Sequence, residues 1–273
     1  MTPNLILPKI NFPQSKISHQ NSLFSLPNPA QAIMKTSLLP IVLLLVSLFF
    51  SCESPRENQR ETLTEVEKMM DLQPFSKLYL SGLVNVVLTQ SDREYLEISG
   101  VKELVDLLEI RQTGETLSLS LKNSDINIDD QSDLEVRIYL KDISELEFEG
   151  AGLIKSSGLL SLNQLMVDGK GVGDIRLELE AESLEISLNF VGNMELKGTV
   201  QEFSILNEGV GNIDASQLIA QKVTLESKGI GAVSVHAEQE LSLEVSGIGM
   251  VSYKGNPTIV YENVSGIGKV NRN

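Results

Sequence analysis

Few side chains in this sequence have the type and spacing that chemistry at a site requires. The 273 residues include two histidines, His19 and His236, and one cysteine, Cys52. His236 lies in an alternating, strand-like stretch without a second histidine or a cysteine beside it. That context predicts neither a histidine-containing metal site nor a catalytic triad, and we interpret His236 as a residue of a solvated strand edge.

The densest group of acidic residues lies between residues 123 and 133. Asp125, Asn127 and Asp129 have the spacing with which an EF-hand loop begins, which makes them weak candidates for calcium binding. The sixth position of such a loop requires glycine, and Asp130 stands there instead. We therefore interpret the segment as a solvated acidic loop and expect neither a metal nor a cofactor.

The lone cysteine has the context of a lipid-modification site. Met34-Lys35 is followed by an apolar run from Leu38 to Phe50, which has the length of a signal-peptide core and is short for a membrane span. The small residue Ser51 directly precedes Cys52, as in a bacterial lipobox. We predict a lipoprotein signal peptide over residues 34–51 and lipidation of Cys52. The alternative is an ordinary free cysteine behind a signal peptide that is cleaved elsewhere.

Two polar segments flank this signal. Residues 1–33 contain five prolines and no acidic residue, and we interpret them as an upstream extension from a misassigned start, with an unusually long leader as the alternative. Residues 52–73 are charged and have little to bury, which predicts a disordered tether.

Beyond the tether, the chain is organised by a pair of glycines that flank one residue. Successive copies start 21, 19, 19, 20, 18 and 19 residues apart, and apolar and polar residues alternate on both sides of each copy. Such a period is typical of a repeat protein, and alternation is typical of strands with one buried face. Because one unit cannot bury its own apolar face, we predict an all-β fold, a parallel β-helix or β-solenoid with glycine corners. The corner glycines are Gly150, Gly152, Gly171, Gly173, Gly192, Gly209, Gly211, Gly229, Gly231, Gly247, Gly249, Gly266 and Gly268.

Two further expectations concern the corner. The residue between the glycines is Ala, Val or Ile in every copy, and we expect it to point into the core. Asp174, Asn193 and Asn212 follow the second glycine in three successive units and could stack as a hydrogen-bonded ladder. The alternative is that they are ordinary turn residues.

The repeats divide the folded part of the chain into two stretches. Residues 149–273 carry the regular Gly-x-Gly units, whereas residues 74–148 alternate like strands but lack regular glycine corners. We interpret 74–148 as degenerate first coils of the same solenoid, with a helical insertion over 101–108. A separate small β domain is the alternative.

The Gly-x-Gly-Asn-Ile/Val string at this period resembles the bacterial family called "putative auto-transporter adhesin, head GIN domain". Gly211-Asn212-Ile213 carries the string, and the stretches Ser81–Val86 and Leu146–Gly152 also fit, so the resemblance covers roughly residues 75–273. It implies a right-handed, pectin-lyase-like β-helix and a role in adhesion without catalytic residues. Phe190 departs from the pattern, because it replaces the first glycine of its unit.

The charge of the chain limits its partners. The net charge is −15, and removal of residues 1–51, with three lysines and no acidic residue, would change it to −18. A nucleic acid needs a basic surface and is not expected as a partner. We interpret the acidic residues on the polar side of the strands as a solvated face. They are Glu178, Glu185, Glu195 and Glu226.

These features predict an exported, outer-membrane lipoprotein whose non-catalytic β-solenoid is an adhesin-like binding or structural module. Its partners would be a lipid anchor in the membrane and an unknown extracellular or envelope ligand, and its polar C-terminal end either caps the solenoid or meets another copy in a homo-oligomer. The sequence leaves open whether it faces the cell surface or the periplasm. One alternative is a periplasmic scaffold. Another is a polysaccharide lyase or hydrolase, for which Arg111, Arg137 and Arg176 could serve, although the chain has no tryptophan for sugar stacking.

Overall fold

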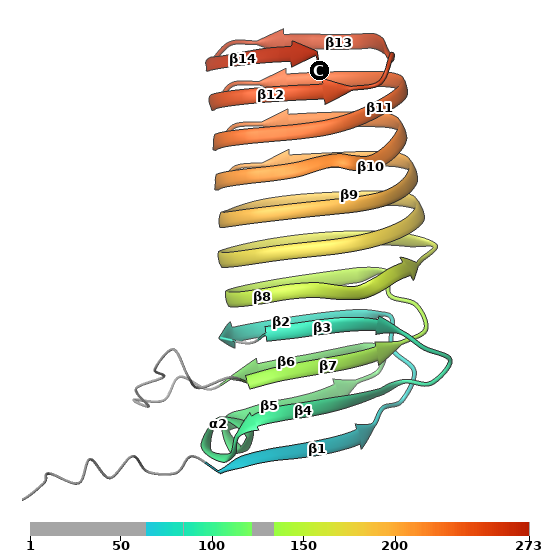
Figure 1. The fold of residues 1–273 in the computed structure, drawn as a ribbon, viewed down its shortest axis with the longest axis vertical. Coiled ribbons are helices and arrows are strands. Elements are labelled where there is room, and N and C mark those ends of the chain that lie inside the picture. The colour runs from blue at the N-terminus through green and yellow to red at the C-terminus, as the bar shows by residue number, and fades with distance from the viewer. Residues whose placement is uncertain (1–63, 84, 122–133, 273) are drawn as a thin grey trace, which may run out of the picture. The chain divides into compact units, whose positions relative to one another are not determined.

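A computed structural model of the chain describes residues 64–83, 85–121 and 134–272, which form a sheet of fourteen strands and a short helix (Figure 1). The first elements are β1 (Glu65–Asp71), β2 (Lys77–Leu83), β3 (Asn85–Gln90), β4 (Tyr95–Val101), α2 (Lys102–Leu107), β5 (Leu108–Thr113), β6 (Thr116–Leu121) and β7 (Leu134–Leu140). They are followed by β8 (Glu145–Ser161), β9 (Gln164–Asn207), β10 (Val210–Ser227), β11 (Ile230–Val245), β12 (Ile248–Lys254), β13 (Thr258–Val264) and β14 (Ile267–Arg272).

From β8 onward, the strands wind as a parallel solenoid. β8 pairs with β9, β9 with β10 and β10 with β11, and then β11 pairs with β12 and β13 while β12 pairs with β14 (Figure 1). The Gly-x-Gly units lie in register, with Gly211 beside Gly192 on one side and beside Gly231 on the other. The all-β solenoid that the period of about 19 residues predicts is therefore confirmed.

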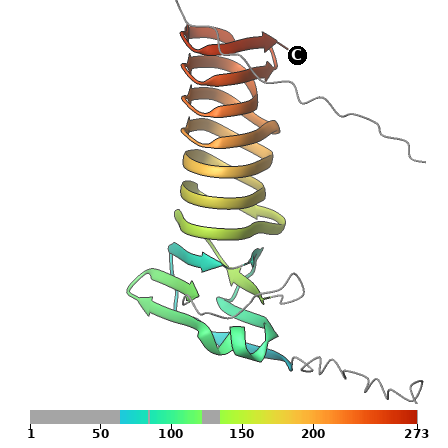
Figure 2. The same ribbon diagram turned by 90° about the vertical axis from the view of Figure 1, so that its left-hand side faces the viewer.

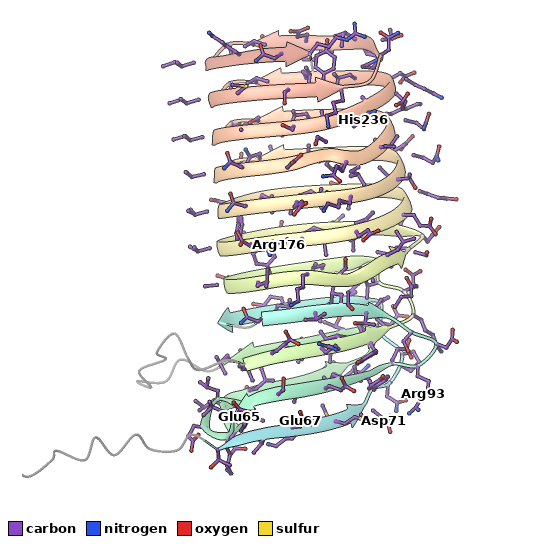
Figure 3. The ribbon with its side chains drawn as sticks, in the orientation of Figure 1. Glu65, Glu67, Asp71, Arg93, Arg176 and His236 are labelled. Atoms are coloured by element: carbon purple, nitrogen blue, oxygen red, sulfur yellow. The ribbon has the colours of Figure 1, made fainter. Side chains whose placement is uncertain are left out.

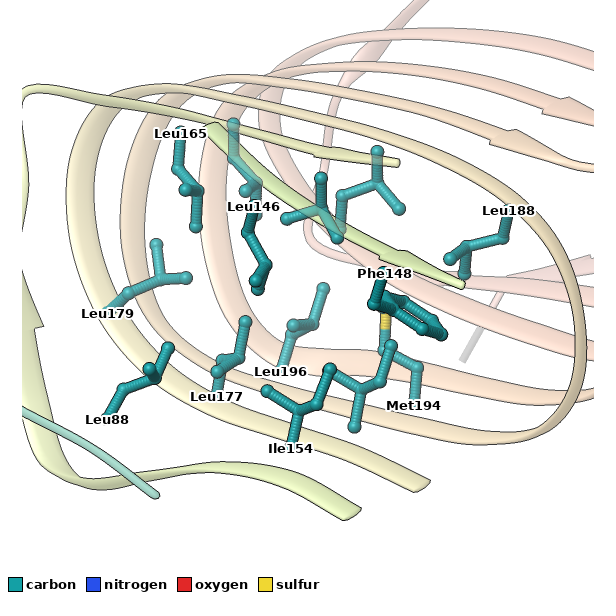
Figure 4. Close-up of a cluster of buried hydrophobic side chains, with 14 of the residues drawn as sticks. Leu88, Leu146, Phe148, Ile154, Leu165, Leu177, Leu179, Leu188, Met194 and Leu196 are labelled. Atoms are coloured by element: carbon teal, nitrogen blue, oxygen red, sulfur yellow. The ribbon is translucent and has the colours of Figure 1, made fainter. Parts of the chain in front are cut away.

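The core lies between the two broad faces of each coil and is built by alternation. In β10 the buried residues Ile213 and Ala215, and then Val223 and Leu225, are two positions apart, as one face of a strand requires. The step lengthens where the strand bends, near the register shift that follows Asp214. Figure 4 shows the stacked apolar side chains inside the first coils, among them Leu146, Leu179 and Leu196, each fully buried. Burying one such side chain contributes about 1.5–3 kcal/mol.

The strands before β8 join the same sheet and the same core. β2 and β3 pair parallel with β8, and β6 and β7 extend the two faces beyond them. β1, β4 and β5 pair antiparallel instead, and α2 supplies the helical insertion that the sequence predicts over 101–108. Residues 74–148 therefore continue the hydrophobic core of the coils, and not all of them are wound as coils.

The prediction of a disordered tether up to residue 73 is wrong for its last part, because Glu65–Asp71 forms β1. This strand is almost entirely exposed, and only Val66 is partly buried against the core. It is held by antiparallel backbone pairing with β4, which a polar side-chain pattern does not reveal.

Several predictions lie outside the described residues. They include the upstream extension, the signal peptide, most of the tether, the lipidation of Cys52 and the weak calcium candidates Asp125, Asn127 and Asp129. Where the structure does describe the chain, no helix combines the length and the apolar character that a membrane crossing needs.

Candidate functional site

The residue between the two corner glycines points outward, contrary to the prediction that it lies in the core. We call the six larger residues at this position the corner stripe, and their exposed fractions are 55% for Val172, 49% for Val191, 46% for Val210, 49% for Ile230, 49% for Ile248 and 80% for Ile267. The stripe follows the edge of the solenoid where β13 ends and β14 begins, at the left of Figure 1, and Figure 2 faces this edge.

Strand alternation explains why the prediction fails. The chain stays extended through the corner, so every second residue points to the same side. Phe190 and Met194 point inward and are 6% and 2% exposed. Val191 has the opposite parity and must point out. The glycines take the crowded positions: a Cβ at Gly211, where φ is +147°, would lie 1.8 Å from the carbonyl oxygen of Gly192. The parity of the flanking strands was the signal that could have placed the stripe outside.

Phe190 stands where the other units have their first corner glycine, and its side chain fills the space inside that corner. Its ring lies edge-on to that of Phe148, two coils earlier, with 5.4 Å between the ring centroids. Between them, a Cβ at Gly169 would lie 2.3 Å from the Phe148 ring, so this glycine makes room for the aromatic pair.

A polar row runs beside the corner stripe, two residues further along each strand. Asn193 donates from Nδ2 to Asp174 Oδ1 at 3.1 Å, and Asn212 donates from Nδ2 to Asn193 Oδ1 at 3.3 Å. The structure thus contains the ladder that the sequence suggests, across three coils. Beyond it, the same position holds Ala232, Met250 and Lys269, which cannot extend an amide ladder.

On the broad face directly after the corner, successive coils carry pairs of oppositely charged side chains. Arg176, which Figure 3 labels, donates to Asp174 at 3.0 Å. Lys197 lies 2.7 Å from Glu195. The hydrogen bond that the Lys197 ammonium group donates to Glu195 raises the pKa of Lys197, with the negative charge of Glu195 as the second cause. These pairs are solvent-exposed, so each contributes little to stability and leaves polar groups available for contact.

His236 lies on β11, where its Nε2 is 2.9 Å from Glu238 Oε1 (Figure 3). The described part of the chain has no group of three or more His, Cys, Asp or Glu residues that could hold a metal ion. The arginines named for the alternative of a lyase do not converge on one another in these pairings, because Arg111 pairs with Glu109, Arg137 with Glu135 and Arg176 with Asp174.

Sequence reasoning missed a cluster of aromatic and charged residues on β4 and β7. The rings of Tyr95 and Tyr139 are stacked with their centroids 4.0 Å apart, and the Tyr139 hydroxyl donates to Glu97 at 2.9 Å. Burial, and then the hydrogen bond to Glu97, raise the pKa of the Tyr139 hydroxyl. Nearby, Arg137 and Glu97 help to line a hollow together with residues of β1. Only the antiparallel pairing of β4 with β7 brings these residues together, and no local sequence pattern gives that pairing.

The chain is similar to a known protein family and to several solved structures. Residues 74–257 match the family described as "putative auto-transporter adhesin, head GIN domain". A solved structure of a putative adhesin from Bacteroides fragilis is 26% identical, with a TM-score of 0.71, and the match covers 77% of this chain and 97% of that one. No curated protein matches the chain.

Two further solved structures share the fold alone. A putative lipid binding protein from Parabacteroides distasonis is 22% identical with a TM-score of 0.57, and the match covers 77% of this chain and 97% of that one. A putative adhesin from Parabacteroides merdae is 18% identical with a TM-score of 0.52, and the match covers 77% of this chain and 96% of that one.

Proposed function

This chain belongs to the head GIN domain family, and from that premise we propose that it is an exported envelope lipoprotein whose β-solenoid is a non-catalytic, adhesin-like binding module. The signal peptide ends at Ser51, Cys52 carries the lipid, and the solenoid is displayed at the outer membrane. The membership of the family supports the binding role, and the apolar run before Cys52 supports the anchor.

The observation that carries the binding role is the in-register repetition of exposed side chains. Asp174, Asn193 and Asn212 stand one coil apart, and strands in one sheet are about 4.8 Å apart. A surface with such a repeat can make the same weak contact many times along an extended ligand. Multivalent contact of this kind raises the overall affinity without any single deep pocket.

Protease shaving of intact cells tests the display of the solenoid. We expect an external protease to digest the full chain while a periplasmic control protein is spared. Protection of the chain until the outer membrane is opened would contradict surface display and favour a periplasmic scaffold. In the same cells, Cys52→Ala should abolish labelling with palmitate, and unchanged labelling would contradict the anchor.

Attachment of cells tests the binding role itself. Cells that produce the full chain should attach to surfaces coated with an acidic polysaccharide, a neutral polysaccharide or a protein better than cells that lack it, on at least one coating. The double variant Asn193→Ala/Asn212→Ala should weaken attachment while Ile219→Ala, a half-exposed residue outside the row, should not. Equal attachment with and without the chain on every coating, or release of unsaturated sugar products, would contradict the proposal.

A further inference from the structure

We propose that the corner stripe is a self-association surface, on which two copies of this chain pair edge to edge with their solenoid axes antiparallel. The stripe is the longest regular row of exposed aliphatic side chains in the described residues, and every member from Val172 to Ile267 is about half exposed or more. Its members are in register, since Val210 pairs with Val191 and Ile230, and Ile248 with Ile230 and Ile267. This inference does not depend on the proposed role in adhesion.

The shape of the stripe suits a second copy of itself. Similar aliphatic side chains repeat at the strand spacing of about 4.8 Å, and the flanking glycines, which Phe190 replaces on one side of Val191, keep the edge smooth. Two such rows can interdigitate in the manner of a dry steric zipper. A two-fold axis also allows one surface to serve both partners, as in most homodimers.

Antiparallel pairing has one register in which all six residues of both stripes are used. Val172 then lies opposite Ile267 of the partner, Val191 opposite Ile248 and Val210 opposite Ile230. We call the residues two positions after each stripe residue the first border and those two positions before it the second border. In the antiparallel arrangement each border faces the same border of the other copy, because the two-fold axis is perpendicular to the stripe and lies in the plane of contact.

The charges on the first border are complementary in this register. Asp174, beside Val172, faces Lys269 of the other copy, which stands beside Ile267, and the contact occurs twice by symmetry. The positions between them are the uncharged Asn193, Asn212 and Ala232, followed by Met250, which is itself 49% exposed. Opposite charges at the two ends of an uncharged row fix both the direction and the register.

The second border is complementary at its centre. Glu208 and Lys228, which precede Val210 and Ile230 by two residues, already lie 3.5 Å apart within one copy. At the two-fold axis, Glu208 of each copy faces Lys228 of the other, which makes an alternating group of four charges. A parallel arrangement would place the first border against the second: Asp174 would face Lys170, but Glu208 would face Asn212 and Lys228 would face Ala232, so fewer opposite charges would meet.

The acidity of the chain argues against an anionic membrane surface as the occupant, because the net charge is −15 and the lysines on the borders of the stripe are nearly balanced by Asp174 and Glu208. The size of the contact argues for weak association. A stripe about 25 Å long on an edge about 10 Å wide buries on the order of 500 Å² over both copies, below the roughly 1,000 Å² of a stable interface. The dimer should therefore be tested in cells that produce the full chain and not in dilute solution.

Disulfide cross-linking in intact cells tests the arrangement. In the double variant Val191→Cys/Ile248→Cys, the two cysteines are three coils, or about 14 Å, apart within one chain, too far for an internal disulfide. Mild oxidation should give a covalent dimer from the double variant and none above the wild-type background from either single variant, the wild type having Cys52 as its only cysteine. A dimer from a single variant would show a parallel arrangement and overturn the proposal, as would a double variant that stays monomeric.

Two additions to the double-cysteine variant test the physical cause. Val210→Asp places two like charges near the axis and should lower the dimer yield about tenfold or more. The control Ile219→Asp, at a residue that is 39% exposed outside the stripe, should leave it unchanged. Lys269→Asp should lower the yield a few-fold, by roughly the strength of an exposed ion pair, and Asp174→Lys should restore it in the same chain. Equal yields from all of these variants would overturn the proposal.

Discussion

The regular coils, β8–β14, and the strands before them, β1–β7, bury the same kinds of side chain but satisfy their backbone hydrogen bonds differently. In the coils, each strand pairs parallel with the equivalent strand of the next coil. Before β8, β1, β4 and β5 pair antiparallel, and α2 buries Leu104 and Val105 against the core. The Gly-x-Gly corners of the parallel coils each keep at least one glycine where neighbouring backbones approach closely, whereas antiparallel strands and a helix close the core without such corners.

The two ends of the described solenoid differ for the same reason. At the β1 end, the helix and the antiparallel strands cover the core, so Leu96 is fully buried on β4. At the other end, every residue of β13 is exposed, including Val260 at 62% and Tyr261 at 50%. Regular repetition thus builds the long faces, and irregular structure is what covers an end.

The largest loss of stability is expected when a corner glycine is replaced, and the loss should be smaller at a glycine outside the corners. Gly211→Ala should lower the free energy of unfolding by about 4 kcal/mol, because a positive φ is strained and the added Cβ would lie 1.8 Å from a backbone oxygen. Gly114→Ala is the control, since its φ is +58° but nothing lies within 4 Å of its Cβ, and it should cost about 1 kcal/mol. Denaturant unfolding measures both, and equal losses would contradict the role assigned to the close contact.

The next effect tests whether regularity itself stabilises a coil. Phe190→Gly would restore the Gly-x-Gly pattern, yet we expect it to lower the free energy of unfolding by about 3 kcal/mol. The reason is the cavity left beside Phe148, whose ring contacts that of Phe190. Phe190→Leu, which refills part of the space, should lose about half as much. A stabilised Phe190→Gly variant would show that the repeat pattern outweighs the packing.

A smaller and more local effect should distinguish the two regions. Leu243→Ala in β11 should lower the local stability by about 2 kcal/mol, at the low end for a buried leucine because few coils follow it. Leu96→Ala in β4 removes an equally buried side chain from the covered end. Hydrogen exchange should show faster opening of β11–β14 for the first variant and of β1–β7 for the second. The same change spread over the whole chain in both variants would contradict coil-by-coil stability.

The sequence predicts those features of the two regions that depend on a local pattern of residues. The spacing of Gly209 and Gly229 predicted the coils, since the crowding at each corner recurs in every unit. The direction of Val191 was predicted wrongly, although the alternation around it gives the right answer when it is followed through the glycines. The pairing of β1 with β4, and the stacking of Tyr95 on Tyr139, depend on contacts between distant segments and have no local signal.

The smallest effect concerns a bend that the coils share and the antiparallel strands lack. Asp214 precedes a register shift in β10 and accepts a hydrogen bond from the Ser216 backbone at 3.0 Å. The Ser216 side chain first, and its backbone N–H as well, hold the pKa of the Asp214 carboxyl below its usual value against the opposing effect of burial. A carboxyl with a lowered pKa in the folded state stabilises the fold above its unfolded pKa of about 3.9, and this contribution is lost as the pH falls through the folded pKa.

Asp214→Asn should therefore be less stable than the wild type at pH 6, by well under about 1 kcal/mol because the group is largely exposed, and the difference should vanish as the pH falls through the folded pKa of Asp214. Thermal unfolding over this pH range measures the difference. Ser216→Ala should flatten the same dependence by removing the largest cause of the shift. A difference between wild type and Asp214→Asn that stays constant with pH would assign the effect to the shape of the bend, and the coils would then turn here without electrostatic help.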